Sequence, residues 1–403
     1  MFDISIILLL IFQGAIKQIF NWFDYFDEFI LVIYSLRIFI QVTLKRKKIK
    51  LFGYEKVTII LLCIFYIIGI ISSYYYKVQG YNMSYIISGL LSIKPIIIYF
   101  IARVVMDGIK IQIKKLNKIY NLLLMCLWIY FGILIVNIPF RFLKNFDERY
   151  GIKTVSIGFE HVSELDFFII SIMVILLFLT YILKKNYKKY LINLIPSFFL
   201  VLFSGRTKAL AFLIVYFFIL IIIFNFGKLK RRYFIAMIPI IIFIGMDRLK
   251  ISLFSLEAAR GALYSTSLKI AMDFFPLGSG FGTFGTAYSA KNYSPLYFYY
   301  GINNVWGLSN NMSSFITDTH WPPILAETGL FGSFIYISII FCLFKLFWKI
   351  DNNIIMRVSI ISLFTFGIIS SVAEPFFMSY KGVAMFIITA FFISVNKSYK
   401  YEN

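Results

Sequence analysis

One of the two histidines, His320, has the sequence surroundings most suited to acid–base chemistry. The run D-T-H-W-P-P covers 318–323, and because proline favours the first turn of a helix, we expect a helix to begin just after His320. Histidine has an unperturbed pKa near 6.5, so it can accept a proton at neutral pH. The nearby Asp318, Trp321 and Glu327 favour a catalytic base, and the alternative is a solvated loop histidine without a function.

Two cations, Arg206 and Lys208, lie in a short turn between apolar runs, in the sequence S-G-R-T-K at 204–208. Gly205 permits the turn, and the helix expected after it offers backbone N–H groups that attract anions. A forked guanidinium, an ammonium group and a helix N-terminus are together the parts of a pyrophosphate site. The alternative is that both side chains anchor two helices at the lipid surface. Arg260, which precedes an amphipathic stretch, fits either a substrate phosphate or lipid head groups.

Lys94 is an ionisable residue near the middle of an apolar run and is followed by Pro95. A lysine at the middle of a membrane span is energetically unfavourable, so by default it indicates a functional site. Pairing with Asp27 or Glu374 from another helix would instead give Lys94 a structural role.

The run at 280–285 reads G-x-G-x-x-G, the pattern of a dinucleotide-binding turn. That function would require a preceding strand and a following helix in a βαβ unit. Here the run follows F-F-P-L in a long loop, so we predict that Gly280 and Gly282 belong to a flexible turn. Acidic residues cluster too little for a metal site and the three cysteines have no paired spacing, so we expect neither a metal nor another cofactor.

The amino-acid composition indicates whether these residues belong to a soluble protein or to a membrane protein. Of 403 residues, 60% are apolar and 15% are charged, whereas ordinary soluble domains have roughly 45–50% and about 25%. A soluble chain of this kind would expose large apolar patches and aggregate. The composition therefore indicates an integral membrane protein and excludes a secreted domain, a cytosolic enzyme and a free nucleic-acid binder.

Apolar runs of roughly 20 residues predict membrane-spanning helices. We predict about twelve, at 4–20, 26–44, 57–76, 85–105, 119–138, 165–183, 190–203, 209–226, 233–246, 324–347, 355–373 and 381–395. The fold class is thus an all-α polytopic bundle, with 1–403 forming a single membrane domain.

The net charge of +21 is concentrated in short connections such as 45–56, 106–118 and 184–189. Lysine and arginine are enriched in cytoplasmic loops, so we predict that these connections and both termini face the cytoplasm. Two long segments, 139–164 and 247–323, then lie on the outer side. A loop as long as 247–323 is usually functional or disordered, and its aromatic residues argue against disorder. We therefore expect the site on the outer face, with His320 at the mouth of the bundle.

Three blocks in the second half of the chain occur in a fixed order. They are the S-G-R turn at 204–206, then Arg260 followed by F-P-L-G-S-G-F-G-T-F at 275–284, then His320 followed by L-A-E-T-G-L-F-G at 325–332. This ordered set resembles the O-antigen polymerase and ligase family of bacterial polysaccharide assembly. The predicted spans, with a large outer loop before a late helix, are also similar to that family.

The resemblance implies a metal-independent, inverting glycosyltransferase in a bacterial cell membrane. Its donor would be an oligosaccharide on undecaprenyl pyrophosphate, and membrane lipids, a chain-length regulator and a flippase would be its other partners. By position, His320 resembles the catalytic base of the family, and Arg206 and Arg260 resemble its pyrophosphate-binding arginines. We place Lys208 with these arginines and predict supporting or substrate-binding roles for Asp318, Glu327, Trp321, Gly280, Gly282 and Lys94.

Three functions remain open on these residues. A polymerase would transfer the glycan to another lipid-linked repeat unit, and we favour it. A ligase would use the same residues with lipid A–core as the acceptor. A polytopic flippase or transporter would explain the spans and the charge, but it should place ionisable residues at mid-depth between helices.

Overall fold

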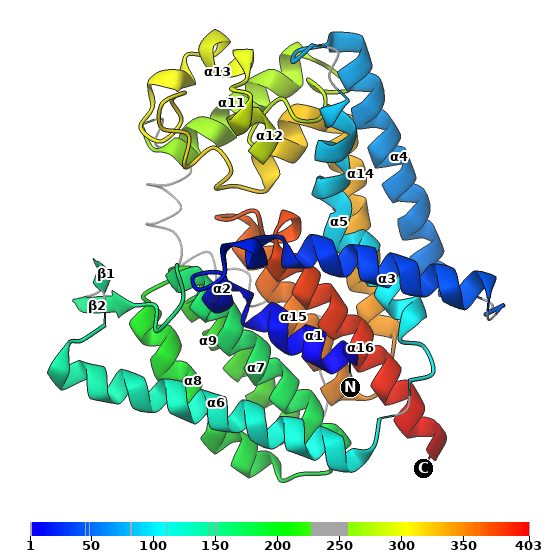
Figure 1. The fold of residues 1–403 in the computed structure, drawn as a ribbon, viewed down its shortest axis with the longest axis vertical. Helices are drawn as coiled ribbons and strands as arrows, with labels where there is room; N and C mark the ends of the chain where they lie inside the picture. The colour runs from blue at the N-terminus through cyan, green and yellow to red at the C-terminus, as the bar shows by residue number, and fades with distance from the viewer. Residues whose placement is uncertain are drawn as a thin grey trace.

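The computed structural model describes residues 2–402 apart from 45, 48, 81–82, 110, 144, 150 and 227–256. The described chain is mostly helical, with one two-stranded hairpin (Figure 1). Within it, eight helices are long and apolar enough to cross a membrane: α4 (Gly53–Tyr76), α5 (Ser84–Val105), α6 (Ile113–Phe140), α7 (Val162–Ile182), α9 (Thr207–Phe226), α14 (Trp321–Lys349), α15 (Ile354–Ser371) and α16 (Tyr380–Glu402). This confirms the predicted class, a helical multi-pass membrane protein.

Four more helices are shorter or more polar: α1 (Phe2–Ile11), α2 (Gln13–Ile16), α3 (Phe26–Thr43) and α8 (Tyr187–Ser204). The span predicted at 4–20 is divided between α1 and α2, and a 3-10 turn, η1 (Asn21–Tyr25), leads into α3. The span predicted at 233–246 lies outside the described residues. The total of about twelve spans therefore stays a prediction.

Both long segments between spans contain regular structure. In 139–164, β1 (Asn145–Arg149) pairs antiparallel with β2 (Ile152–Val155), a small addition to the expected all-α fold. Residues 247–256 lie outside the described chain. The rest of the larger segment contains α11 (Ala259–Asp273), α12 (Ala287–Lys291), α13 (Pro295–Tyr299) and the 3-10 turn η2 (Ile302–Asn304).

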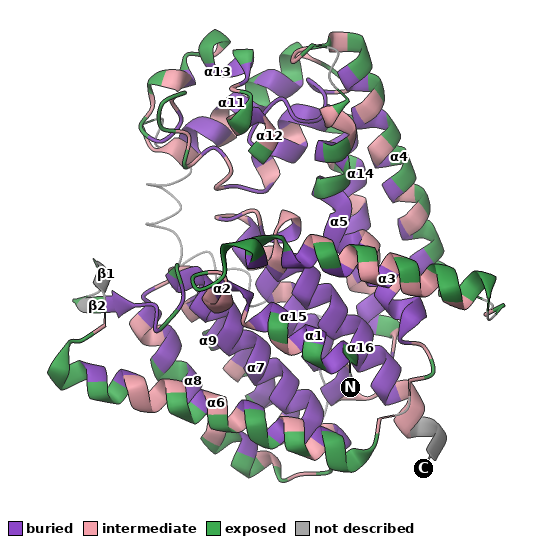
Figure 2. Ribbon diagram, viewed as in Figure 1, coloured by how far each residue is buried: buried purple, intermediate pink, exposed green. Residues whose placement is uncertain are grey.

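α7 is the central helix, and its side chains are buried along almost its whole length (Figure 2). α15 and α16 pack beside it, and the rings of Phe178 on α7 and Phe392 on α16 stack with centroids 4.1 Å apart. α16 also packs against α5, while α14 packs against α4 and α11. A helix that is apolar on all sides suits a position enclosed by other helices or by lipid, and α7 is enclosed by other helices.

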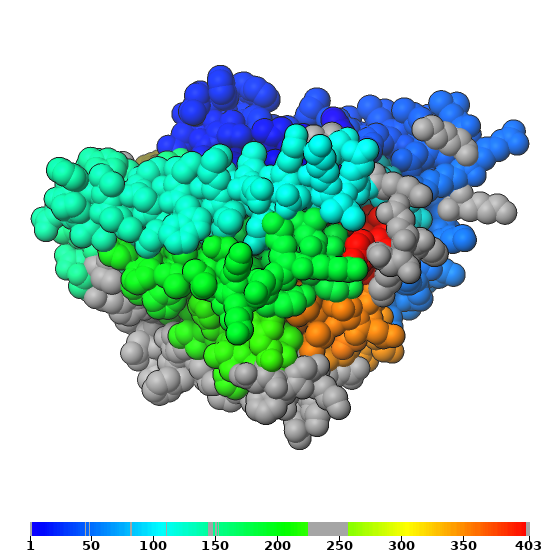
Figure 3. Space-filling view, turned by 90° about the horizontal axis from the view of Figure 1, so that it is seen from below, coloured from blue at the N-terminus to red at the C-terminus, as the bar shows by residue number. Residues whose placement is uncertain are grey.

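The peripheral helices expose apolar side chains instead of polar ones. On α4, Ile60, Ile64, Ile67 and Ile71 are all exposed, and their spacing places them on one face of the helix. α6 forms a band across one face of the molecule (Figure 3), and Leu122, Met125 and Ile129 are among its exposed side chains. These faces suit contact with lipid tails, which agrees with the membrane assignment.

Ion pairs and hydrogen bonds link connections at two places in the bundle. At one end, the Lys47 ammonium donates to the carbonyl oxygens of Val104 at 2.7 Å and Asp107 at 2.9 Å. Lys397 pairs with the Asp107 carboxylate at 2.8 Å, so the predicted inner connections and the C-terminal helix meet there. At the other end, Lys17 pairs with Glu160 at 2.8 Å. We call this second group of connections the site end.

Candidate functional site

Several helix ends meet at the site end of the bundle. They are the start of α7, the turn from α8 to α9, the start of α11, the segment before α14, and the connection from α15 to α16 through η3 (Phe376–Met378). Gly205 ends α8 in a left-handed conformation with φ of 66°. A Cβ atom there would lie 2.4 Å from Thr154 Cγ2, so the turn requires glycine. The predicted turn at Gly205 is confirmed, and α9 begins directly after Arg206.

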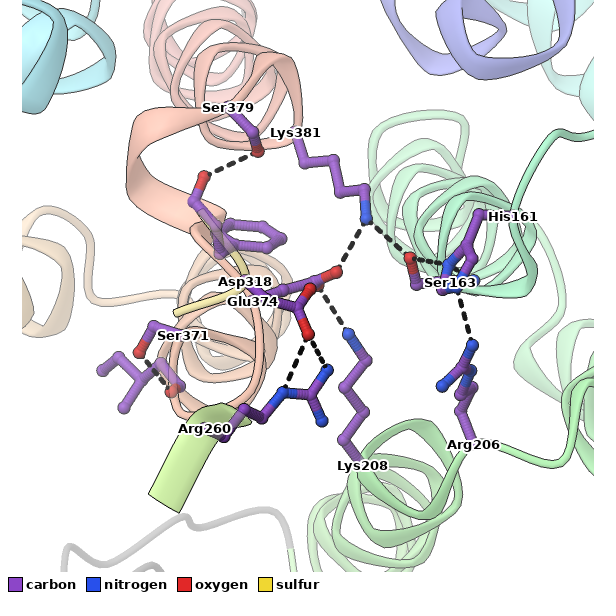
Figure 4. Close-up of polar contacts among 12 residues, drawn as sticks. His161, Ser163, Arg206, Lys208, Arg260, Asp318, Ser371, Glu374, Ser379 and Lys381 are labelled. Atoms are coloured by element: carbon purple, nitrogen blue, oxygen red, sulfur yellow. Dashed lines mark hydrogen bonds and ion pairs between the residues drawn. The ribbon is translucent and has the colours of Figure 1, made fainter. Parts of the chain in front are cut away.

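Glu374 lies between two lysines (Figure 4). Its carboxylate is 2.7 Å from the Lys208 ammonium and 2.8 Å from the Lys381 ammonium, and Lys381 also donates to Ser163 Oγ at 3.0 Å. Burial alone would raise the pKa of Glu374, but the two ammonium groups outweigh burial and hold that pKa well below its usual range. Glu374 is therefore a carboxylate that holds both lysines in place.

Arg260 reaches the site from the first turn of α11. Its guanidinium donates to Asp318 Oδ2 through Nε at 3.0 Å and also through Nη2. Burial raises the pKa of Asp318, although Arg260 opposes this effect. Tyr264, one turn further along α11, donates to the Val372 carbonyl at 2.9 Å and so ties α11 to the end of α15. Arg260 and Asp318, both sequence candidates, thus form one ion pair.

Arg206 contacts a histidine instead of a carboxylate. Its Nη2 is 2.8 Å from His161 Nε2, and His161 Nδ1 is 2.8 Å from Ser163 Oγ. Burial, and then the positive charge of Arg206, lowers the pKa of His161 to about 4. His161 is therefore neutral at neutral pH, although part of the residue is exposed. No role was predicted for His161, because nothing in its local sequence indicates its contact with Arg206.

His320 lies deeper than the sequence predicts. The residue is 0% exposed, and its ring packs against Trp321, Tyr336 and Phe377 at centroid distances of 5.4, 5.5 and 5.4 Å. Trp321 Nε1 donates to Ser371 Oγ at 3.0 Å, which closes the first turn of α14 against α15. The prediction of an open position at the mouth of the bundle is wrong for this side chain. The local sequence shows Trp321 but not Tyr336 or Phe377, which are distant in sequence and complete the aromatic enclosure.

Neither ring nitrogen of His320 has a hydrogen-bond partner among the described residues. Burial lowers the pKa of His320 to about 3, because the enclosure disfavours the charged imidazolium. The side chain is thus a neutral imidazole with an uncommitted lone pair. Asp318, which holds Arg260, lies two residues earlier in the chain.

Asp166 is a buried acidic residue of the same region that the sequence analysis missed. It lies in the first turns of α7, is 0% exposed, and is close enough to Lys208 and Arg206 to feel their charges. The signal available in the sequence was an acidic residue at the start of an otherwise apolar span. Asp166 brings a third carboxylate to the cluster, beside Glu374 and Asp318.

The glycine-rich run binds a carboxylate of this chain. The Phe284 N–H donates to Glu327 Oε1 at 3.1 Å, and Thr286 Oγ1 lies 3.3 Å from the same oxygen. Gly280 packs so closely that a Cβ atom there would lie 2.5 Å from Ser73 Cα. The predicted flexible turn is therefore wrong: the run is buried, and it holds the loop onto α14 and α4.

Lys94 has carboxylate partners on another helix. Its ammonium contacts Asp27 and Glu28 on α3, and both Lys94 and Asp27 are buried. The structural alternative, pairing with Asp27, is the arrangement observed. This pair joins α3 to α5.

Four cations, one from the turn before α9 and three from α9, α11 and α16, therefore converge with three carboxylates: Arg206, Lys208, Arg260 and Lys381 with Glu374, Asp318 and Asp166. The positive excess and the N-termini of α7, α9 and α16 favour an anion at this position. Among the described residues, no group of three His, Cys, Asp or Glu side chains is placed to hold a metal ion.

Comparison of the sequence with protein-family models gives no match, and a search of curated proteins also gives none.

Proposed function

We propose that this protein is a membrane glycosyltransferase that extends a polysaccharide from a lipid-linked donor. The observation that carries the proposal is the convergence of Arg206, Lys208 and Arg260 at one end of the bundle, beside the segment that contains His320. A cationic group at the end of a membrane bundle suits a substrate whose pyrophosphate is fixed to a lipid chain. The chain would enter from the bilayer while the sugar stays at the aqueous surface.

The reaction follows from the charges. An acceptor hydroxyl attacks the anomeric carbon of the donor sugar, and the bond from that carbon to the pyrophosphate oxygen breaks. The electron pair passes to the pyrophosphate, so negative charge grows there in the transition state. Fixed guanidinium and ammonium groups stabilise that charge more strongly in a site that excludes water. In comparable preorganised sites, removal of one donor lowers the rate by roughly 10²–10³.

The proton of the acceptor hydroxyl passes to His320 in this proposal. The neutral imidazole has the free lone pair that a general base requires. Its pKa of about 3 makes it a weak base in the enclosed state. A bound pyrophosphate would raise that pKa by stabilising the imidazolium. The proposal requires the ring of Trp321 or Phe377 to move aside so that an acceptor can reach His320.

The acceptor we propose is a second lipid-linked repeat unit, which makes the protein a polymerase. Lipid A–core in the same position would make it a ligase. A flippase or transporter is less well supported, because the mid-span Lys94 is paired with Asp27 and Glu28 and joins two helices. In this proposal the site end faces the outer leaflet of a bacterial cell membrane.

Deletion of the gene in its own host tests the proposal. A polymerase deletion should leave single lipid-linked repeat units in the membrane and remove long chains from a glycan gel. Plasmid copies with Arg206→Ala or His320→Phe should reach wild-type abundance in the membrane but fail to restore long chains. Long chains that persist on the lipid carrier and are lost only from lipid A–core would indicate a ligase. An unchanged glycan profile would refute both transferase functions.

A further inference from the structure

One arginine of the site has a charged partner and the other has a neutral partner. Arg260 forms an ion pair with the Asp318 carboxylate. Arg206 forms no ion pair with a carboxylate of the described chain, and its side-chain partner is the imidazole of His161 at 2.8 Å. Asp166 and Glu374 act on Arg206 only at longer range.

The hydrogen bonds determine which nitrogen of His161 carries the proton. A guanidinium has donors and no acceptor, so His161 Nε2 must accept from Arg206 and cannot carry a proton. The neutral imidazole then has its proton on Nδ1, 2.8 Å from Ser163 Oγ, and the Ser163 backbone N–H, 3.3 Å from the same nitrogen, would donate to it only in the other tautomer. Ser163 Oγ accepts a second hydrogen bond from the Lys381 ammonium at 3.0 Å. One uncharged unit, His161 with Ser163, therefore holds a cation at each of its two ends.

The orientation of this unit is determined by the helix that carries it. His161 is the residue before α7, so the start of that helix places its ring. α7 is the most enclosed of the candidate spans, so its first residues have a fixed position. The Nε atom of Arg206 is buried and has no partner among the described residues. That donor is uncommitted.

We propose that His161 is a positioning residue that fixes the guanidinium of Arg206 for an anionic phosphate group without neutralising its charge. A carboxylate in the same position would also hold the arginine. It would, however, compete with the phosphate, as Asp318 does at Arg260. The two arginines would then bind the anion in different ways. Arg260 must leave the Asp318 carboxylate before it contacts the anion, whereas Arg206 has no carboxylate partner to leave.

This inference rests on the anion site of the proposed function, and three substitutions separate it from a purely structural role. His161→Gln keeps an acceptor for Arg206, His161→Leu removes it, and His161→Glu replaces it with a carboxylate. Each full-length variant is purified in detergent, its thermal unfolding is recorded, and inorganic pyrophosphate is titrated by calorimetry. Glu160→Gln is the control, because Glu160 is adjacent to His161 and pairs with Lys17 instead of Arg206.

We expect pyrophosphate to bind His161→Gln and the control within about threefold of the wild type. His161→Leu should bind roughly tenfold more weakly, because the guanidinium loses its fixed direction. His161→Glu should also bind roughly tenfold more weakly, yet unfold at a temperature no lower than the wild type, because it gains an ion pair. A role limited to stability would not reduce binding in a variant that is as stable as the wild type.

Three results would overturn the inference: pyrophosphate binding by His161→Glu equal to that of the wild type, equal binding by the Leu and Gln variants, or no binding by the wild type. The proposed function can fail separately. If the variants rank as expected but the purified wild type forms no glycan from a lipid-linked donor, the positioning role stands and the transferase function is wrong.

Discussion

Replacing His320 with phenylalanine should change how the stability of the protein depends on pH. The folded chain holds a neutral imidazole whose pKa is about 3, whereas the unfolded chain has the ordinary value near 6.5. The unfolded state therefore binds a proton that the folded state does not bind. Stability falls as the pH decreases from about 6.5 toward 3, and this contribution is retained above that range. Phenylalanine suits the same aromatic enclosure and cannot titrate.

The expected magnitude follows from the two pKa values. Between about pH 7.5 and about pH 5, protonation of the unfolded histidine lowers the free energy of unfolding of the wild type by about 2 kcal/mol. The full shift from 6.5 to about 3 would be worth about 5 kcal/mol if the pH were lowered past the folded pKa. The folded site excludes water on all sides of His320, so solvent screening reduces this effect little.

The assay compares denaturant unfolding of the wild type and His320→Phe in the same detergent at the two pH values. All other titrating groups, including His161, are present in both proteins and cancel in the comparison. The wild type should lose about 2 kcal/mol more than the variant on acidification. Parallel losses in both proteins would show that His320 is hydrated and charged in the folded chain. The same variant should be inactive in glycan transfer.

Three further substitutions have expected outcomes. Gly280→Ala should destabilise the protein by roughly 2–4 kcal/mol more than Gly301→Ala in thermal unfolding, because both glycines have positive φ but only the first meets backbone atoms; equal effects would refute the close packing. Lys94→Met should lower stability by about 3–5 kcal/mol by leaving the Asp27 carboxylate buried without its ammonium partner, and unfolding unchanged from the wild type would show that the pair does not form. Glu374→Gln should lower the unfolding temperature without pyrophosphate and recover it when pyrophosphate is added, whereas no recovery would argue against an anion at the two lysines.

Local patterns predicted several features of the fold. Apolar length identified the spans that the structure describes as helices, proline placed the start of α14 at Trp321, and Gly205 placed the turn before α9. The charge pattern separated the connections into two groups, and the structure links three members of one group, 45–56, 106–118 and the C-terminal helix. These features depend on residues close together in the sequence, or on whether the chain is surrounded by lipid or by water.

The features that sequence reasoning missed depend on contacts between distant segments. The enclosure of His320 requires Phe377, and the partner of Lys208 is Glu374, each on a different element. The glycine-rich run looked like a ligand-binding turn because a bound phosphate and a buried carboxylate use the same backbone donors. Nothing in the local sequence of Glu327 shows that it is this carboxylate.

The most direct measurement of the central claim uses purified protein in liposomes that contain an oligosaccharide on undecaprenyl pyrophosphate. The wild type should form chains of several repeat units and release undecaprenyl pyrophosphate without added metal. Arg206→Ala and Arg260→Ala should each remain folded and slow this release by roughly 10²–10³. Release at the wild-type rate from both variants, or no release from the wild type with an authentic donor, would contradict the account.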